Sequence, residues 1–212
     1  MQFRIKAPQA MDPMSNPFFN LYSHGFARVA VGVPECKVAD PAFNAAQTIA
    51  LAQQAAQGGA VLVAFPELGL SAYTCDDLFH QKALLDACEA ALDQVARATA
   101  ELDIAVIVGA PLRVAHQLYN CAVVIAGGRI LGVVPKSFLP NYSEFYEARQ
   151  FSAADCAVAT EIRLLDQTVP FGPSCCSRWR SCRCSSSTSR SAKTSGCRSR
   201  RPRSRRWPAP RC

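Results

Sequence analysis

Short apolar runs alternate with longer, helix-type patterns over most of the chain. The apolar runs are rich in β-branched residues and too short for helices, so they predict buried strands. The stretches between them are rich in Ala, Gln and Leu, and the first opens with Asp40 as an N-cap and Pro41 at the first helical position. In chain order, we predict a strand at 26–33, a helix from 41 to the glycines at 58 and 59, a strand at 60–65, a short helix beginning at 75, a helix at 82–102 and a strand at 104–108.

A glycine pair further along the chain predicts a hairpin. Gly127 and Gly128 separate apolar runs at 119–126 and 129–134, and two glycines between such runs are typical of a tight β-turn. The order strand, helix, strand, helix, strand and hairpin predicts an α/β fold in which helices cover a sheet. With 212 residues, the chain is long enough for one domain with a sizeable core.

Two of the predicted strands end in the same way. Residues 61–73 read V-L-V-A-F-P-E-L-G-L-S-A-Y, and residues 133–151 read V-V-P-K-S-F-L-P-N-Y-S-E-F-Y-E-A-R-Q-F. In each stretch an apolar strand reaches a proline that is followed by one charged residue, Glu67 or Lys136. If both strands lie in one sheet, we expect the two side chains to emerge at the same edge and meet. A lysine held between carboxylates suits acid–base chemistry or anion binding, and the alternative is a solvated surface charge cluster.

These stretches, in this order, resemble the nitrilase or carbon–nitrogen hydrolase superfamily. The similarity is more specific to the glutaminase domain of glutamine-dependent NAD synthetases, through F-P-E-L-G-L-S-A-Y, C-D-D-L-F and P-K-S-F-L-P-N-Y-S-E-F-Y-E-A-R-Q-F. It covers residues 18–172. It implies an α-β-β-α sandwich that pairs with a second copy, and glutamine as the substrate. A stand-alone carbon–nitrogen hydrolase acting on another amide or nitrile is the alternative.

The resemblance also implies roles for individual residues. Glu67 matches the family's general base, Lys136 the residue that stabilises the charged tetrahedral intermediate, and Glu147 a second carboxylate that holds the lysine and the substrate amide. The family's nucleophile is a cysteine after a third strand, beyond the lysine motif, so Cys75 is not its counterpart. A carboxylate beside a thiol and an ammonium can accept the thiol proton, while the cation stabilises the oxyanion.

The resemblance further implies a pocket and the cofactors of the reaction. Tyr73, Phe145 and Tyr142 match positions that line the glutamine pocket, and ordinary core packing is the alternative interpretation for the first two. The glutaminase step needs no cofactor, because ATP and magnesium belong to a synthetase domain that this sequence lacks. The histidines have no metal-ligand spacing, so we expect no metal site.

Charge and cysteine are unevenly distributed along the chain. The net charge of +7 comes from residues 173–212, which hold eleven Arg, one Lys and no acid, so residues 1–172 carry a net charge of −5. A basic tail can bind nucleic acid, but such tails rarely hold six cysteines, and we do not favour that alternative. The other five cysteines show no paired spacing, and no apolar run could span a bilayer. We therefore expect a cytoplasmic protein without a membrane segment.

The two ends of the chain lack periodicity, and we expect both to be disordered. Residues 1–17 are interpreted as a leader. Reading the codons of 173–212 one base earlier converts each Cys to Leu, Val or Met, and permits H-V-E-I-C-E-D-L-W, which is similar to the family's nucleophile motif. Its cysteine codon straddles Ser191 and Ala192. Our hypothesis is that this tail is frameshifted, so that the nucleophile expected near Ser191 is absent, the sandwich is incomplete and the chain is inactive.

Overall fold

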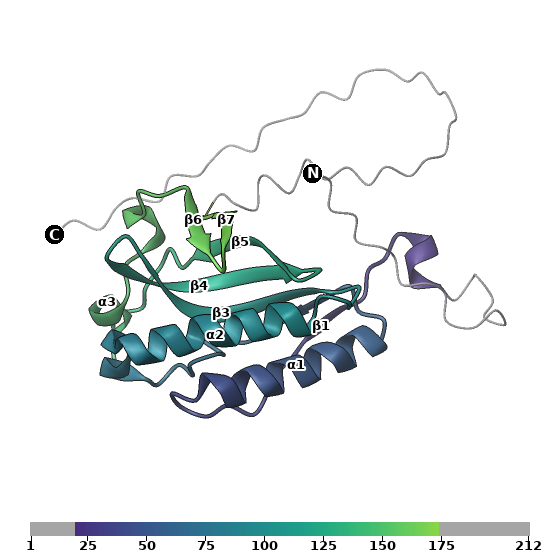
Figure 1. The fold of residues 1–212 in the computed structure, drawn as a ribbon, viewed down its shortest axis with the longest axis horizontal. Coiled ribbons are helices and arrows are strands. Elements are labelled where there is room, and N and C mark those ends of the chain that lie inside the picture. The colour runs from purple at the N-terminus through teal and green to yellow at the C-terminus, as the bar shows by residue number, and fades with distance from the viewer. Residues whose placement is uncertain (1–19, 174–212) are drawn as a thin grey trace, which may run out of the picture. The chain divides into compact units, whose positions relative to one another are not determined.

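The computed structural model describes residues 20–173, and five of the strands in this range form one sheet (Figure 1). The expectations for the leader at 1–17 and for the tail lie outside these residues. Strand order in the sheet follows the sequence, with β1, β2 and β3 parallel and β4 antiparallel to both of its neighbours. The strands are β1 (Val29–Val31), β2 (Leu62–Ala64), β3 (Ala105–Val114), β4 (Gln117–Ala126) and β5 (Arg129–Pro135). The predicted α/β class is confirmed.

Two long helices, α1 (Pro41–Gln57) and α2 (Lys82–Ala98), lie side by side on one side of the sheet (Figure 1). Asp40 caps α1 as predicted, because its carboxylate accepts from the Phe43 N–H at 3.1 Å. The second helix ends at Ala98, four residues earlier than predicted. Its last turn tightens after Thr99, where the Ala100 N–H bonds to the Arg97 carbonyl three residues back.

Shorter elements complete the described chain. Three 3-10 helices are η2 (Leu21–His24), η3 (Asp76–His80) and η4 (Ala154–Cys156), and the predicted short helix after Cys75 corresponds to η3. One turn of α-helix, α3 (Glu147–Gln150), follows the lysine motif. A final hairpin consists of β6 (Glu161–Leu164) and β7 (Gln167–Pro170), which lies beside β5 through a bridge between Val133 and Phe171.

The core lies between the sheet and the two helices. Strand residues that face the helices are almost fully buried: Val63, Val106, Val108, Val123, Ile125 and Val133. On β1, by contrast, the side chains that face away from the helices are exposed, 63% for Val29 and 80% for Val31. The described residues thus hold one helix-covered sheet, which fits the prediction of an incomplete sandwich. None of the helices in residues 20–173 is long and apolar enough to cross a membrane.

A buried amide in α1 connects three parts of the chain. Asn44 is fully buried, and its side chain accepts from the Lys37 N–H at 2.7 Å and donates to the Lys37 carbonyl at 2.8 Å. It also donates to the Leu70 carbonyl at 3.0 Å, in the loop that follows β2. The first turns of α1 are therefore tied to the segment before the helix and to the loop that carries Glu67.

Candidate active site

The ends of β2 and β5 deliver two charged residues to the same edge of the sheet. These strands run in the same direction, because β5 is antiparallel to β4 and β4 is antiparallel to β3. Glu67 follows β2 after Phe65 and Pro66, and Lys136 follows β5 directly. Lys136 Nζ lies 2.6 Å from Glu67 Oε1, so the predicted meeting of the two side chains is confirmed. The two strands are not adjacent, however, since β3 and β4 lie between them.

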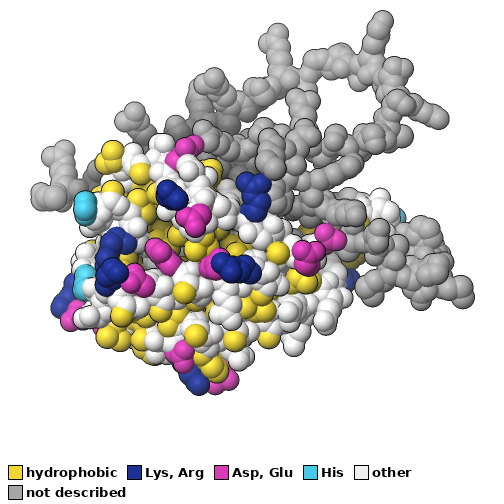
Figure 2. All heavy atoms as spheres, viewed as in Figure 1, with side chains coloured by type: hydrophobic (Ala, Val, Ile, Leu, Met, Phe, Trp, Pro, Cys, Tyr) yellow, Lys and Arg dark blue, Asp and Glu magenta, His cyan; other side chains and the backbone are white. Residues whose placement is uncertain are grey.

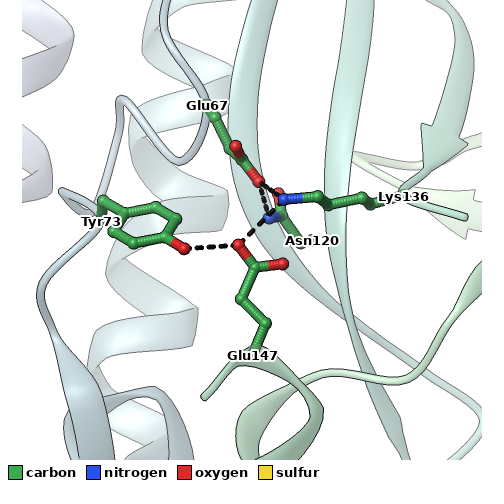
Figure 3. Close-up of polar contacts among 5 residues, drawn as sticks. All are labelled: Glu67, Tyr73, Asn120, Lys136 and Glu147. Atoms are coloured by element: carbon green, nitrogen blue, oxygen red, sulfur yellow. Dashed lines mark hydrogen bonds and ion pairs between the residues drawn. The ribbon is translucent and has the colours of Figure 1, made fainter. Parts of the chain in front are cut away.

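A second carboxylate reaches the same ammonium group (Figure 3). Glu147, the first residue of α3, places its Oε1 2.9 Å from Lys136 Nζ. The hydroxyl of Tyr73 donates to this oxygen at 2.6 Å. Lys136 therefore lies between Glu67 and Glu147, and the surface-cluster interpretation is wrong for Glu147, whose side chain is only 5% exposed.

Asn120 belongs to this network, and the sequence analysis missed it. Its side-chain amide donates to Glu67 Oε1, and its backbone carbonyl accepts from the Lys136 N–H at 2.8 Å. Asn120 is 4% exposed, on β4 between the two strands that carry Glu67 and Lys136. The available signal was a single amide within the otherwise apolar run at 119–126, where a buried polar side chain needs a partner.

The position of Glu67 depends on the absence of a side chain at Gly109. A Cβ added there would lie 2.3 Å from the Leu68 nitrogen and 2.7 Å from the Pro66 carbonyl oxygen. The loop after β2 thus crosses directly over β3. Leu68 has a φ of 51°, in the left-handed region that side chains seldom adopt, and this turn directs the preceding carboxylate towards Asn120 and Lys136.

The network favours a charged lysine and a neutral tyrosine. Burial alone lowers the pKa of Lys136, but its hydrogen bonds and charge interactions with Glu67 and Glu147 outweigh this, so its pKa is raised above the usual value. Burial raises the pKa of Tyr73, as do the hydrogen bond to Glu147 and the nearby negative charges. The site therefore presents an ammonium and a phenol next to two carboxylates.

One oxygen of the network has no partner. Glu147 Oε2 is buried and accepts no hydrogen bond within the described residues. A buried carboxylate oxygen without a donor is costly, and such groups usually mark a place for water or ligand. The bonds of Glu67, in turn, all go to its Oε1. Each carboxylate thus keeps one oxygen that can accept a proton or a hydrogen bond.

Aromatic side chains border the network. The Tyr73 and Phe145 rings meet edge to face with centroids 6.5 Å apart, and those of Tyr142 and Phe145 are 5.7 Å apart. Tyr73 is 37% exposed and Tyr142 68%, so neither is a core residue. The core-packing alternative is therefore wrong for Tyr73, while the half-buried Phe145 lies between the two tyrosines.

The cysteine nearest to Glu67 in sequence is not activated. Cys75 is buried, and its Sγ donates to the Ser71 carbonyl at 3.0 Å. Burial raises its pKa, which favours the unreactive thiol over the thiolate. The position expected for the nucleophile, near Ser191, lies outside the described residues. Within residues 20–173, no group of three His, Cys, Asp or Glu side chains could hold a metal ion.

Fold and site together define the class, an α/β enzyme with a lysine held between two carboxylates at the edge of its sheet. The family model described as carbon–nitrogen hydrolase matches residues 28–182, which is most of the chain. The chain therefore belongs to the carbon–nitrogen hydrolase family, as the strand-end motifs predicted.

Relatives found by sequence similarity are consistent with this assignment. The glutamine-dependent NAD(+) synthetase of Mycobacterium tuberculosis is 47% identical over 155 residues, and that of Mycobacterium leprae 44% over 156 residues. These matches cover 73% and 74% of this chain but only 23% of each relative. The chain thus spans about a quarter of the length of the curated relatives it matches.

Solved structures give the same result. A glutamine-dependent NAD(+) synthetase from Cytophaga hutchinsonii superposes with a TM-score of 0.64 and 27% identity, over 69% of this chain and 25% of that one. An amidase from Nesterenkonia sp. superposes with a TM-score of 0.52 over 64% of this chain and 50% of its own. At 22% identity, the amidase supports the fold alone.

Proposed function

We propose that Glu67, Lys136 and Glu147 form the amide-binding and acid–base part of a glutamine amidohydrolase site. The observation that carries the proposal is the ammonium of Lys136 between two carboxylates, one of which keeps a buried oxygen without a donor. The NH₂ group of a primary amide would supply that donor. The similarity to glutamine-dependent NAD synthetases favours glutamine among the possible amides.

The proposed chemistry needs a thiol at the site. Glu67 would accept the thiol proton as the sulfur attacks the amide carbon, and Lys136 would stabilise the negative charge that develops on the carbonyl oxygen. Ammonia would leave with a proton returned by Glu67, and water would then cleave the thioester to give glutamate and restore the thiol. The step uses no cofactor.

We further propose that this chain does not complete the reaction. Its described residues supply the acid–base groups, while Cys75 is buried and bonded elsewhere. A serine at the expected position near Ser191 would be far less acidic than a thiol and would not replace it. ATP-dependent use of the ammonia for NAD synthesis would belong to the remaining length of the relatives. A cytoplasmic location and pairing with a second copy also remain proposals.

Amide recognition can be tested by titrating the full chain with L-glutamine and following the NMR signals of Tyr73 and Glu147. We expect saturable shifts with glutamine and none with glutamate, whose carboxylate cannot donate to Glu147 Oε2. Glu147→Gln should weaken binding about tenfold, since a charge-assisted hydrogen bond is lost. Glu144→Gln is the matched control, because Glu144 is an exposed carboxylate of the same loop.

The outcomes of this titration separate the alternatives. Equal binding of glutamate, or equal weakening by Glu144→Gln, would contradict the proposal. Shifts with acetamide but none with glutamine would favour a hydrolase of another amide. An ammonia-release assay tests the missing thiol, and we expect no activity above background. Ammonia release that survives replacement of every cysteine at 1–172 but is lost in Glu67→Ala would show that we are wrong about the nucleophile.

A further inference from the structure

A second polar cavity lies beside the β3–β4 hairpin, apart from the site described above. Its volume is about 520 Å³, and it is open to solvent. Its polar lining comes from η3, both hairpin strands and the segment at α3: His80, Arg113, His116, Gln117, Gln150 and Ser152. All of these side chains can donate hydrogen bonds, and no Asp or Glu is among the lining residues.

Arg113 is distinctive because its charge is uncompensated. Among residues 20–173, it is the one Lys or Arg side chain for which no hydrogen bond, ion pair or ring contact exists. On the adjoining elements η3 and α3, Asp77 pairs with Arg149, and Glu147 with Lys136. Arg113 is exposed, so its guanidinium is solvated and available to an anionic ligand.

We propose that this cavity binds a small oxyanion, a phosphate or carboxylate group, with Arg113 as its anchor. The planar guanidinium matches two oxygens of such a group at once. Gln117 and Ser152 also line the cavity and can donate to the remaining oxygens. Phe79, which is buried, and Leu118 supply the apolar part of the lining.

The strand register separates this cavity from the candidate active site. Arg113 pairs with Leu118, and Pro111 pairs with Asn120, so the two places are one side-chain repeat apart on the β3–β4 ribbon. This repeat is about 7 Å along a strand. None of Glu67, Lys136 and Glu147 lines the cavity. The oxyanion site is therefore a neighbour of the amide site and does not depend on the function proposed for it.

The test is a titration of the full chain with inorganic phosphate and, separately, with acetate, both at ionic strength matched with sodium chloride. The readout is the Arg113 Nε–H signal together with the Gln117 and Ser152 amides, measured by NMR. A site-resolved readout is needed because the twelve basic residues at 173–212 also attract anions. We expect saturable shifts at these three positions with at least one of the two anions.

Two variants of equal charge decide the result. Arg113→Gln should weaken binding at the cavity at least about tenfold, because the bidentate contact is lost. Arg97→Gln removes the same charge from an exposed position on α2 and should leave the affinity unchanged. Shifts with phosphate alone would assign a phosphate group, and shifts with acetate a carboxylate. No saturable shift with either anion, or equal weakening by both variants, would overturn the proposal.

Discussion

Two ion-paired arrangements connect α3 to the rest of the molecule, and they differ in burial. Lys136 contacts Glu147, with side-chain exposures of 27% and 5%, whereas Arg149 contacts Asp77 at 67% and 70%. Water screens the Arg149–Asp77 pair, called here the outer pair, and such a pair stabilises the fold by about 0–1 kcal/mol. In the inner pair, Lys136–Glu147, the carboxylate of Glu147 is almost fully buried, so water cannot solvate it if the lysine is removed. The same kind of ion pair therefore holds the site together where it is buried and contributes little where it is exposed, although the Arg149–Asp77 pair is also short, at 3.0 Å.

Removing the inner ammonium should have the largest effect. Lys136→Met leaves Glu147 buried without its cation, so we expect the free energy of unfolding to fall by about 3 kcal/mol. Urea denaturation at neutral pH measures the change. Arg149→Met is the matched control, with an expected loss below about 1 kcal/mol. Equal losses for the two variants would mean that burial does not distinguish the pairs.

Displacing the Glu67 loop should have the next largest effect. Gly109→Ala places a methyl group against the backbone at Pro66 and Leu68, so the loop has to move, at a cost of about 2 kcal/mol. The same measurement on Gly58→Ala is the control, because a Cβ there would make only ordinary contacts at 3.4 Å. An NMR shift of the Lys136 side chain in Gly109→Ala alone would show that Glu67 moved. Unchanged stability would contradict the close crossing.

The inner cluster should also respond to alkaline pH. The pKa of Lys136 is raised in the folded protein, so its stabilising contribution is complete below the unfolded lysine value, about 10.4, and is lost as the pH rises through the folded value. The free energy of unfolding should therefore fall as the pH rises through this range. The loss is measured as the difference in unfolding free energy between the native chain and Glu67→Gln, from neutral pH to pH 11. A constant difference over this range would contradict the assigned cause.

The outer pair should give the smallest effect. Asp77→Asn removes one charge of an exposed pair, so we expect a destabilisation below about 1 kcal/mol that disappears in high salt. Chemical denaturation in low and high sodium chloride measures it. A loss of several kcal/mol that persists in high salt would show that the outer pair, and not burial of Glu147, positions α3.

The sequence predicted the strands of the five-stranded sheet, the two long helices and the meeting of Glu67 with Lys136, because apolar periodicity and strand-end prolines are local signals. It did not predict the continuation of β3 to Val114. Pro111 lacks an N–H, yet it is tolerated because the pairing of β3 with β2 ends at Ile107. The turn at Ala115 and His116 also carried no signal, since both adopt positive φ without being glycine.

Only part of the site was predicted, because the sequence shows local signals and does not show which strands are neighbours. Charged residues after strands are visible in the sequence, whereas Asn120 became part of the network only through the register that places β4 between β2 and β5. The β6–β7 hairpin was missed as well. Its turn at Leu165 and Asp166 again has positive φ without glycine, and its strands are only four residues long.

The side-chain amide of Asn44 should slow hydrogen exchange and local opening in the native chain. It accepts from the Lys37 N–H while fully buried, so this loop proton should exchange with deuterium as slowly as those in the middle of α1. The hydrogen bond from Asn44 to the Leu70 carbonyl makes the loop that carries Glu67 part of the same cooperative unit. Opening of that loop should therefore require the first helix to come away from the sheet.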